Sequence, residues 1–212
     1  MPKIITVAHQ KGGVGKTTLS LFLYQHMTMY GANCAVIDTD PQKSIKVLYE
    51  TLGSNDNWGT LNLIDPDDYS WDQIVKLDYD IIIVDTPPAY VDIIDKVLKY
   101  ADFVLVPCKA SPLDLLAIRE TVSQVEAAQK INPNLKAGIV LNQVIFRSSF
   151  TEEAKNVLKQ SHSLPVLNTV IHNRADIARF LTKSISVHNE KNRKVDEEVS
   201  LLINEIVEML RS

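Results

Sequence analysis

A run rich in glycine and lysine near the start of the chain has the residue types that hold a polyphosphate. It reads His9-Gln10-Lys11-Gly12-Gly13-Val14-Gly15-Lys16-Thr17-Thr18. Glycines let the backbone curl until several N–H groups point at one phosphate, and a following helix N-terminus adds partial positive charge. In such a loop Lys16 reaches the β- and γ-phosphates and the Thr17 hydroxyl binds Mg²⁺. A short apolar run precedes it and a helical pattern follows, which is the context that a phosphate loop needs.

Two acidic segments follow apolar runs further along the chain. One is Asp38-Thr39-Asp40-Pro41-Gln42, and the other is Asp85 after four branched apolar residues. Carboxylates at the carboxyl ends of parallel strands face the crevice where ligands bind in open α/β sheets. Beside a triphosphate they must hold water or Mg²⁺, because direct contact is repulsive. Asp85 therefore fits a metal site next to Thr17. A plain turn with Asp at its caps remains the alternative for residues 38–42.

Short apolar runs alternate with longer helical patterns through the chain. The apolar runs cover residues 4–8, 34–37, 81–84, 103–106, 137–141 and 166–171, and the helical patterns cover 16–30, 91–99, 112–130, 151–160, 174–183 and 195–210. Nearly continuous apolar strands are typical of a parallel sheet that is covered on both faces. The pattern predicts an α/β fold, a doubly wound and mostly parallel sheet with helices on both faces, in one domain spanning 1–212. Residues 53–72 look like a loop-rich connection.

Local capping signals support two of these helices. Ser111 before Pro112 suits an N-cap followed by a first-turn proline. Ser149 with Glu152 three residues later fits a capping box.

Charge is unevenly distributed along a chain of net charge −4. Residues 38–102 hold 14 acidic and 5 basic side chains, whereas residues 145–194 hold 9 basic and 4 acidic ones. Arg179 and Lys183 are spaced i, i+4, so they share a helix face in the basic part. This part can bind a polyanion locally, or its bases can simply be solvated helix faces.

Cysteine usage and hydropathy indicate the cellular compartment. Cys34 and Cys108 lie in or beside apolar runs, without metal-ligand spacing or a disulfide framework, so we expect both to be buried. No apolar run reaches the roughly 18 residues that span a bilayer. We expect a cytoplasmic protein.

The phosphate loop departs from the plain pattern in one informative way. Gln10 stands at the first glycine position, and the second lysine, Lys11, lies five residues before Lys16. Lys-Gly-Gly-x-Gly-Lys-Thr-Thr resembles the deviant Walker loop of the ParA/MinD family of partition and positioning ATPases. The resemblance implies that Lys11 reaches across a dimer interface to the partner's nucleotide, so that residues 11–18 (Lys11, Gly12, Gly13, Val14, Gly15, Lys16, Thr17 and Thr18) contact the cofactor.

The same resemblance extends to the other site segments. Residues 38–42 are similar to the family's D-x-D-P-Q motif, which implies that Asp40 orients the attacking water and that Asp38 supports the Mg²⁺ site. Thr86-Pro87-Pro88 resembles the segment that senses the γ-phosphate. Asn142, which ends an apolar run, matches an adenine contact, although a turn asparagine is an equal alternative. Arg174 falls in a segment that lies near the nucleotide base in the family.

By resemblance, the chain looks like the short partition ATPases that lack an N-terminal helix-turn-helix domain. This implies binding of ATP and Mg²⁺, an ATP-dependent homodimer, and non-specific DNA binding through Arg179 and Lys183 in a nucleoid-associated protein. Hydrolysis would be stimulated by a centromere-binding ParB-like partner.

Three further classes of protein share parts of this pattern. A MinD-like ATPase would need a basic amphipathic helix at the membrane, but residues 195–210 form an acidic one that anionic lipid repels, so no stable membrane binding is expected. A cargo-positioning ATPase on the nucleoid would use the same chemistry. A synthetase of the dethiobiotin type would need a small-molecule pocket, and Lys11 favours the dimeric switch.

Overall fold

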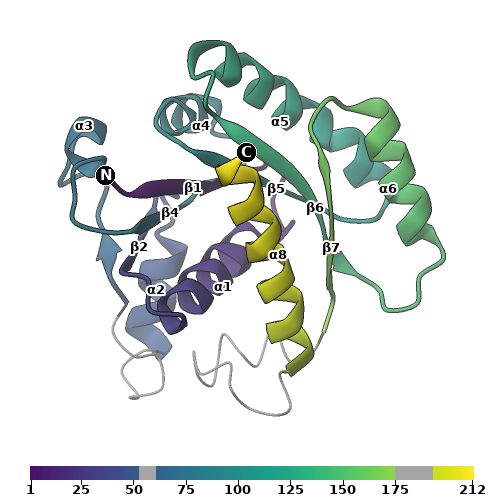
Figure 1. Cartoon of the computed structure of the whole chain (residues 1–212), viewed down its shortest axis with the longest axis horizontal. Coiled ribbons are helices and arrows are strands. Elements are labelled where there is room, and N and C mark those ends of the chain that lie inside the picture. The colour runs from purple at the N-terminus through teal and green to yellow at the C-terminus, as the bar shows by residue number, and fades with distance from the viewer. Residues whose placement is uncertain (53–60, 175–192) are drawn as a thin grey trace.

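A parallel sheet forms the centre of the molecule, as the apolar runs predict. The computed structural model describes residues 1–52, 61–174 and 193–212. Within them, seven parallel strands are arranged in the order β3-β2-β4-β1-β5-β6-β7 (Figure 1). The strands are β1 (Lys3–Val7), β2 (Cys34–Asp38), β3 (Leu63–Ile64), β4 (Ile81–Asp85), β5 (Phe103–Cys108), β6 (Lys136–Val144) and β7 (Val166–His172). The doubly wound fold class is confirmed.

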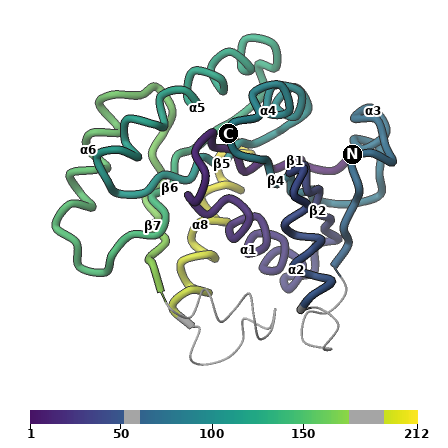
Figure 2. The backbone as a smooth tube through the Cα atoms, turned by 180° about the vertical axis from the view of Figure 1, so that it is seen from behind, coloured from purple at the N-terminus to yellow at the C-terminus, as the bar shows by residue number. Residues whose placement is uncertain are grey.

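Helices cover both faces of this sheet. They are α1 (Lys16–Met29), α2 (Ser44–Leu52), α3 (Trp71–Ile74), α4 (Val91–Leu98), α5 (Pro112–Ile131), α6 (Phe150–Ser161) and α8 (Arg193–Arg211). One hydrophobic core joins the sheet to α3, α4, α5 and α6, and a second joins the opposite face to α1, α2 and α8 (Figures 1 and 2). Cys34 and Cys108 are buried and free. The helix expected over 174–183 lies outside the described residues.

Three short elements were not expected from the sequence. The helix α2, the two-residue edge strand β3 and the single-turn helix α3 lie in or next to the segment that was predicted as a loop-rich connection. Ile45, Leu48 and Tyr49 turn one side of α2 toward the sheet, which is an amphipathic signal in the sequence. The strand β3 has only two residues, which is too short to give a periodic pattern.

The two capping predictions have different outcomes. The Ser111 side chain accepts a hydrogen bond from the backbone N–H of Asp114, and Pro112 occupies the first turn of α5, as predicted. The prediction for Ser149 is wrong, because its side chain makes no capping bond. Ser148, one residue earlier, accepts from Phe150 N–H at 3.3 Å instead, since the tight turn after β6 brings its hydroxyl to that amide.

The C-terminal helix α8 packs its apolar side on the molecule, as its pattern predicts. Val195, Val199, Leu202 and Ile206 are buried in the core that α8 shares with α1. Its acidic residue Glu205 accepts backbone N–H bonds from two residues of the edge strand β7, both at 2.7 Å. The helix therefore satisfies part of an edge that would otherwise expose unpaired amides.

The α8 packing can be tested with two neighbouring leucines. Leu202 is fully buried, whereas Leu201 is 57% exposed. We expect Leu202→Ala to lower the free energy of unfolding by about 2–5 kcal/mol, because it removes a buried side chain and leaves a cavity. Leu201→Ala should change it by less than about 0.5 kcal/mol. Urea unfolding followed by circular dichroism measures both, and equal effects would contradict the described packing.

Candidate functional site

The phosphate loop lies between β1 and α1, at the carboxyl edge of the sheet. Gly13 and Gly15 have φ angles of 73° and 91°, a left-handed conformation that favours glycine. Asn142 Nδ2 donates to the Val14 carbonyl at 2.7 Å. A Cβ atom on Gly15 would lie 2.4 Å from this Nδ2 atom, so the end of β6 leaves no room for a side chain there. The loop is thus held in its curled shape by its own glycines and by β6.

Lys16 lies inside the curl that the loop makes. It is 6% exposed, and its Nζ donates to the Lys11 carbonyl at 3.2 Å. Burial lowers the pKa of Lys16, and the carboxylates of Asp85 and Asp40 partly offset this effect. The ammonium occupies the position from which it can meet phosphate oxygens above the loop.

Asp85 ends β4 directly beneath the start of α1. Its two carboxylate oxygens accept hydrogen bonds from Thr17 Oγ1 at 2.7 Å and Ser20 Oγ at 3.0 Å. Burial raises the pKa of Asp85 to about 7, although both hydroxyl bonds oppose the shift. A nearby cation stabilises the ionised form of such a buried carboxylate.

Asp38 lies beside Asp85, since the two residues are partners in the register of β2 and β4. Its oxygens accept from the backbone N–H groups of Asp40 at 3.1 Å and Ile45 at 2.8 Å, which shapes the loop before α2. Burial raises the pKa of Asp38 above its ordinary value. Asp40 is partly exposed and accepts from Gln42 N–H at 2.9 Å.

This donor set fits Mg²⁺. Two buried carboxylates, Asp38 and Asp85, and the Thr17 hydroxyl converge next to the phosphate loop, and both carboxyl pKa values are raised by burial. Mg²⁺ takes one or two carboxylates together with phosphate oxygens and waters rather than an all-protein cage. The described residues contain no cluster of three or more acidic, histidine or cysteine side chains placed to hold a metal.

The segment after β4 is attached to the phosphate loop. Thr86 Oγ1 donates to the Val7 carbonyl at 2.9 Å, and Ala89 N–H donates to the Gln10 carbonyl at 2.9 Å. Ala89 has a φ angle of 60°, which is a left-handed conformation uncommon for a residue with a side chain. A direct hydrogen bond therefore joins the phosphate loop to residues 86–89.

The Lys11 side chain extends from the loop toward α5. Its Nζ lies 2.6 Å from Asp114 Oδ1 in the first turn of α5, where the Lys11 side chain is 40% exposed and that of Asp114 is 7% exposed. The Lys11 backbone N–H donates to Nδ1 of His9 at 2.8 Å. His9 is fully buried, and burial together with the charge of Lys16 lowers the pKa of His9 to about 4. A neutral imidazole thus holds this part of the loop.

The remaining expected ligand residues are placed differently. Asn142 contacts the phosphate loop, and its adenine contact stays a prediction. Arg174 NH2 lies 2.5 Å from Glu198 Oε1 of α8, so its side chain is engaged at the end of β7. Arg179 and Lys183 lie outside the described residues.

Several residues of the site were missed by the sequence reasoning. Ser20 could have been found, because it lies one helical turn after Lys16 on the same face. Asp114 follows the predicted N-cap Ser111 by three residues, so its place in the first turn of α5 could be predicted from the sequence. Its pairing with Lys11 could not. Gln124 accepts from Gln10 Nε2 at 3.1 Å across 114 positions, and no local signal reveals such a contact.

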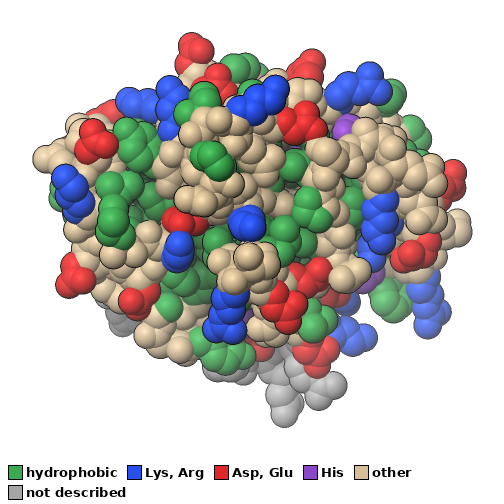
Figure 3. Space-filling model, turned by 45° about the horizontal axis from the view of Figure 1, so that its top comes forward, with side chains coloured by type: hydrophobic (Ala, Val, Ile, Leu, Met, Phe, Trp, Pro, Cys, Tyr) green, Lys and Arg blue, Asp and Glu red, His purple; other side chains and the backbone are tan. Residues whose placement is uncertain are grey.

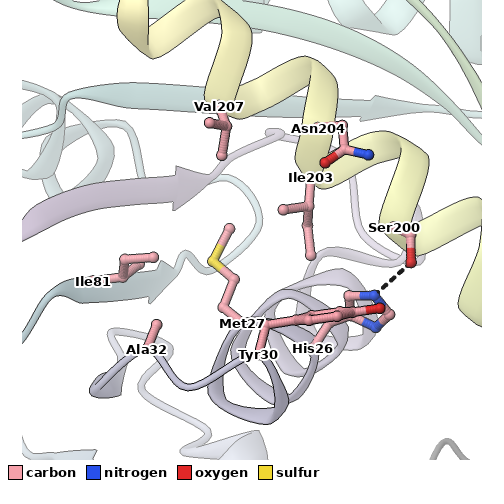
Figure 4. A pocket seen from close by; sticks show the side chains of 9 residues that line it. All are labelled: His26, Met27, Tyr30, Ala32, Ile81, Ser200, Ile203, Asn204 and Val207. Carbon is pink, nitrogen blue, oxygen red and sulfur yellow. Dashed lines mark hydrogen bonds between the residues drawn. The ribbon is translucent and has the colours of Figure 1, made fainter.

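A hollow of about 430 Å³ lies between α1 and α8, and it is separate from this site (Figure 4). Met27, Ile81 and Ile203 supply part of its apolar lining, and His26 Nε2 is bonded to Ser200 Oγ at 2.7 Å at its rim. It lies at the C-terminal end of α1, roughly 15 Å along the helix from Lys16. In the view of Figure 3, acidic, basic and apolar side chains are interspersed over the surface.

A parallel sheet with a phosphate loop after its central strand and acidic ends on the neighbouring strands defines a P-loop nucleotide-binding protein. Residues 5–187 match the family model described as the CobQ/CobB/MinD/ParA nucleotide binding domain. The chain belongs to this family, which confirms the resemblance drawn from the motifs.

Individual relatives of known name are similar over nearly the whole chain. Identity is 32% over 209 residues with the maintenance of carboxysome distribution protein A of Halothiobacillus neapolitanus, covering 96% of this chain and 95% of that protein. It is 24% over 242 residues with the chromosome-partitioning ATPase Soj of Thermus thermophilus, covering 95% and 96%. A variant of Cyanothece McdA in complex with ATP has the same fold, with a TM-score of 0.71, 18% identity and coverage of 97% and 96%.

The buried neutral His9 predicts a pH dependence of stability. Its folded pKa lies near 4 and its ordinary value is 6.5, so the unfolded chain binds the proton more tightly. The stabilisation from neutral His9 is complete above pH 6.5 and is lost as the pH falls toward 4. We expect the free energy of unfolding of the nucleotide-free protein to fall by up to about 3 kcal/mol relative to that of His9→Asn over this range. Urea titrations of both proteins from pH 7.5 to 4 measure it, and parallel curves would contradict the assignment.

Proposed function

We propose that this protein is an ATP-dependent dimeric switch that hydrolyses ATP slowly and positions a cargo over non-specific DNA. The observation that carries the proposal is the pair of lysines around one loop. Lys16 is buried within the loop, and Lys11 lies half-exposed at its rim. The ATP complex of the similar Cyanothece protein supports ATP as the nucleotide. The carboxylates of Asp38 and Asp85 beside Thr17 support Mg²⁺ as the accompanying metal ion.

Hydrolysis in this proposal is an in-line attack of water on the γ-phosphate. Thr17 and Asp85, with Asp38 beside them, would hold Mg²⁺, which would supply positive charge at the nucleotide phosphates. Lys16 neutralises the charge that develops on the phosphate oxygens. Asp40 lies at the mouth of the site and orients the attacking water through its carboxylate. Asn142 and Arg174 are proposed to lie near the base.

Apolar side chains around the site support a dimer that closes over it. The segments following β4, β5 and β6 carry large apolar residues that are 44–73% exposed, namely Tyr90, Val91, Leu113, Leu116, Ile145 and Phe146. Carboxyl ends of parallel strands share one edge, so these residues surround the edge from which Lys11 projects. A second copy of the chain would cover them and receive Lys11 at its nucleotide, which makes turnover depend on dimerisation.

The relatives favour cargo or replicon positioning over membrane attachment and over a metabolic synthetase. The 32% identical relative is named for carboxysome distribution, which favours a protein compartment as cargo, whereas the relative named for chromosome partitioning favours a replicon with a ParB-like partner. The apolar side of α8 is buried, and no helix among the described residues is long and apolar enough to cross a membrane. We propose one domain over 1–212 and a nucleoid-associated location in the cytoplasm.

The roles of the two lysines can be separated by mutation. Lys16→Ala should weaken ATP binding by at least about 100-fold, because it removes the ammonium that is enclosed by the loop. Lys11→Ala should leave ATP affinity within about threefold but abolish the ATP-dependent dimer and lower turnover. Calorimetry measures affinity and sedimentation velocity measures the dimer. A normal ATP-dependent dimer of the Lys11 variant would disprove a role for this lysine in the partner subunit.

DNA binding tests the remaining part of the proposal. Replacing Arg179 and Lys183 with Glu should reduce affinity for a random duplex at least about 10-fold and flatten its salt dependence, while the ATP-dependent dimer remains. Lys155→Glu with Lys159→Glu on α6 is the matched control, since it makes the same charge change at the same spacing. Gel-shift titrations with ATP across a salt series decide between them. Equal losses of DNA affinity in both double variants would assign the effect to net charge. An unchanged DNA affinity of the Arg179 and Lys183 variant would instead place the DNA at Arg147 or at Lys191, Arg193 and Lys194.

A further inference from the structure

A serine, a histidine and an aspartate meet where the last turn of α1 packs against α8. His26 Nε2 and Ser200 Oγ are 2.7 Å apart, and His26 Nδ1 lies 3.2 Å from Asp196 Oδ1. His26 and Ser200 are 174 positions apart in the chain, so the fold and not a local motif brings them together. None of the three residues belongs to the nucleotide site.

The surroundings of His26 favour one form of its ring. The residue is 1% exposed, and the carboxylate of Asp196 faces Nδ1. Asp196 Oδ1 is buried and has no aligned hydrogen bond with the described residues, which leaves the Nδ1–H group beside it as the available donor. Contacts of this kind are often loose before a substrate binds. With the proton on Nδ1, Nε2 accepts from the Ser200 hydroxyl and can take its proton.

A third side chain on α8 completes this arrangement. Asp196, Ser200 and Asn204 follow one another at intervals of four residues, so they share one side of the helix. The Asn204 amide makes no hydrogen bond with another described residue, and it lies one turn beyond Ser200 (Figure 4). Side chains one turn apart are roughly 5–6 Å apart at Cβ. The Asn204 N–H groups can therefore reach an oxygen atom on a carbon bonded to Ser200 Oγ.

The hollow of about 430 Å³ opens beside these polar groups. Its volume lies in the range of small-molecule sites. The described residues that line it include no Asp, Glu, Lys or Arg, and most of the lining is apolar, namely Met27, Ala32, Ile81, Ile203 and Val207. An uncharged apolar chain fits this lining better than a charged one, because nothing in it would pair with a charge.

We propose that this hollow is a second active site, in which Ser200 hydrolyses carboxylic esters that carry an uncharged, apolar acyl chain. Ser200 Oγ attacks the ester carbonyl carbon while its proton passes to His26 Nε2. The bond from that carbon to the alkoxy oxygen breaks, and the leaving oxygen takes the proton from His26 as an alcohol. Asn204 donates to the carbonyl oxygen as negative charge develops on it. Asp196 is a positioning residue that orients the imidazole.

The second half of the reaction uses water as its only co-reactant. Water attacks the acyl carbon and gives a proton to His26 Nε2, which passes it to Ser200 Oγ as the carboxylic acid leaves. The sum is one ester and one water converted to one acid and one alcohol. This chemistry needs neither ATP nor a second subunit, so it is independent of the proposed switch.

Direct labelling tests the nucleophile in the unaltered protein. Diisopropyl fluorophosphate should attach one diisopropyl phosphate group per chain, with loss of fluoride, and peptide mass spectrometry should place it on Ser200. Ser200→Ala should take up no label. Ser163→Ala is the matched control and should be labelled like the parent, because Ser163 is also hydrogen-bonded, to Glu126, but does not line the hollow.

Turnover of p-nitrophenyl hexanoate separates the roles of the four residues. Ser200→Ala and His26→Gln should lower kcat at least about 100-fold. Asn204→Ala should lower kcat about 10-fold or more with KM within about threefold, because its hydrogen bond strengthens in the transition state. Asp196→Asn should also lower kcat with little change in KM, which a role in holding α8 alone would not produce. Circular dichroism checks folding, and the Asn204 and Asp196 variants carry the comparison if His26→Gln is unfolded.

Each result decides for or against the second active site. Absence of label on Ser200, label found on other residues instead, or parent-level turnover in Ser200→Ala overturns it. ATP affinity of Ser200→Ala should equal that of the parent, so a failure here leaves the proposed ATPase function standing. A parent protein that binds no ATP would overturn that function and leave the labelling result unaffected.

Discussion

Buried charge at the carboxyl edge of the sheet is the constraint on which the site depends. Asp38 and Asp85 end neighbouring strands in register, and burial raises the pKa of both. Backbone amides and hydroxyls hold these carboxylates, but Lys16, whose own pKa is lowered by burial, offers only one positive charge. In the free protein, the negative charge of the two carboxylates is therefore only partly balanced. A metal–nucleotide ligand that supplies cation and phosphates together stabilises the folded state by binding to it alone.

The same edge connects the ligand site to the outer surface. Carbonyl groups of the phosphate loop bond to three separate places: Val14 to the end of β6, Gln10 to Ala89 and Lys11 to Lys16. The Ala89 contact leads directly into α4, whose first residues carry exposed apolar side chains. A backbone hydrogen bond therefore joins the phosphate loop to the segment that carries this exposed apolar surface.

The sequence predicts the parts of this arrangement that are local. Continuous apolar runs locate six of the seven strands because a strand buried on both faces needs apolar residues throughout. The phosphate loop is recognisable because Gly13 and Gly15 must adopt positive φ angles. Long-range pairs follow from strand order instead, so the Lys11–Asp114 contact becomes visible only when β5 is placed beside β1. Arg174 is a second case, because its pair with Glu198 of α8 is not visible in any local pattern, and its contact with the nucleotide stays a prediction.

Lys11 and Lys16 belong to one loop and lie five residues apart, but they differ in burial. Lys16 begins α1 and points into the curl, where enclosure fixes its ammonium and lowers its pKa. Lys11 precedes the glycines and lies at the rim, where its side chain is 40% exposed and pairs with Asp114. The enclosed ammonium is confined to the loop of its own subunit, whereas the rim ammonium lies at the surface. Burial, rather than residue type, therefore distinguishes the two lysines, and this difference underlies the separate roles proposed for them.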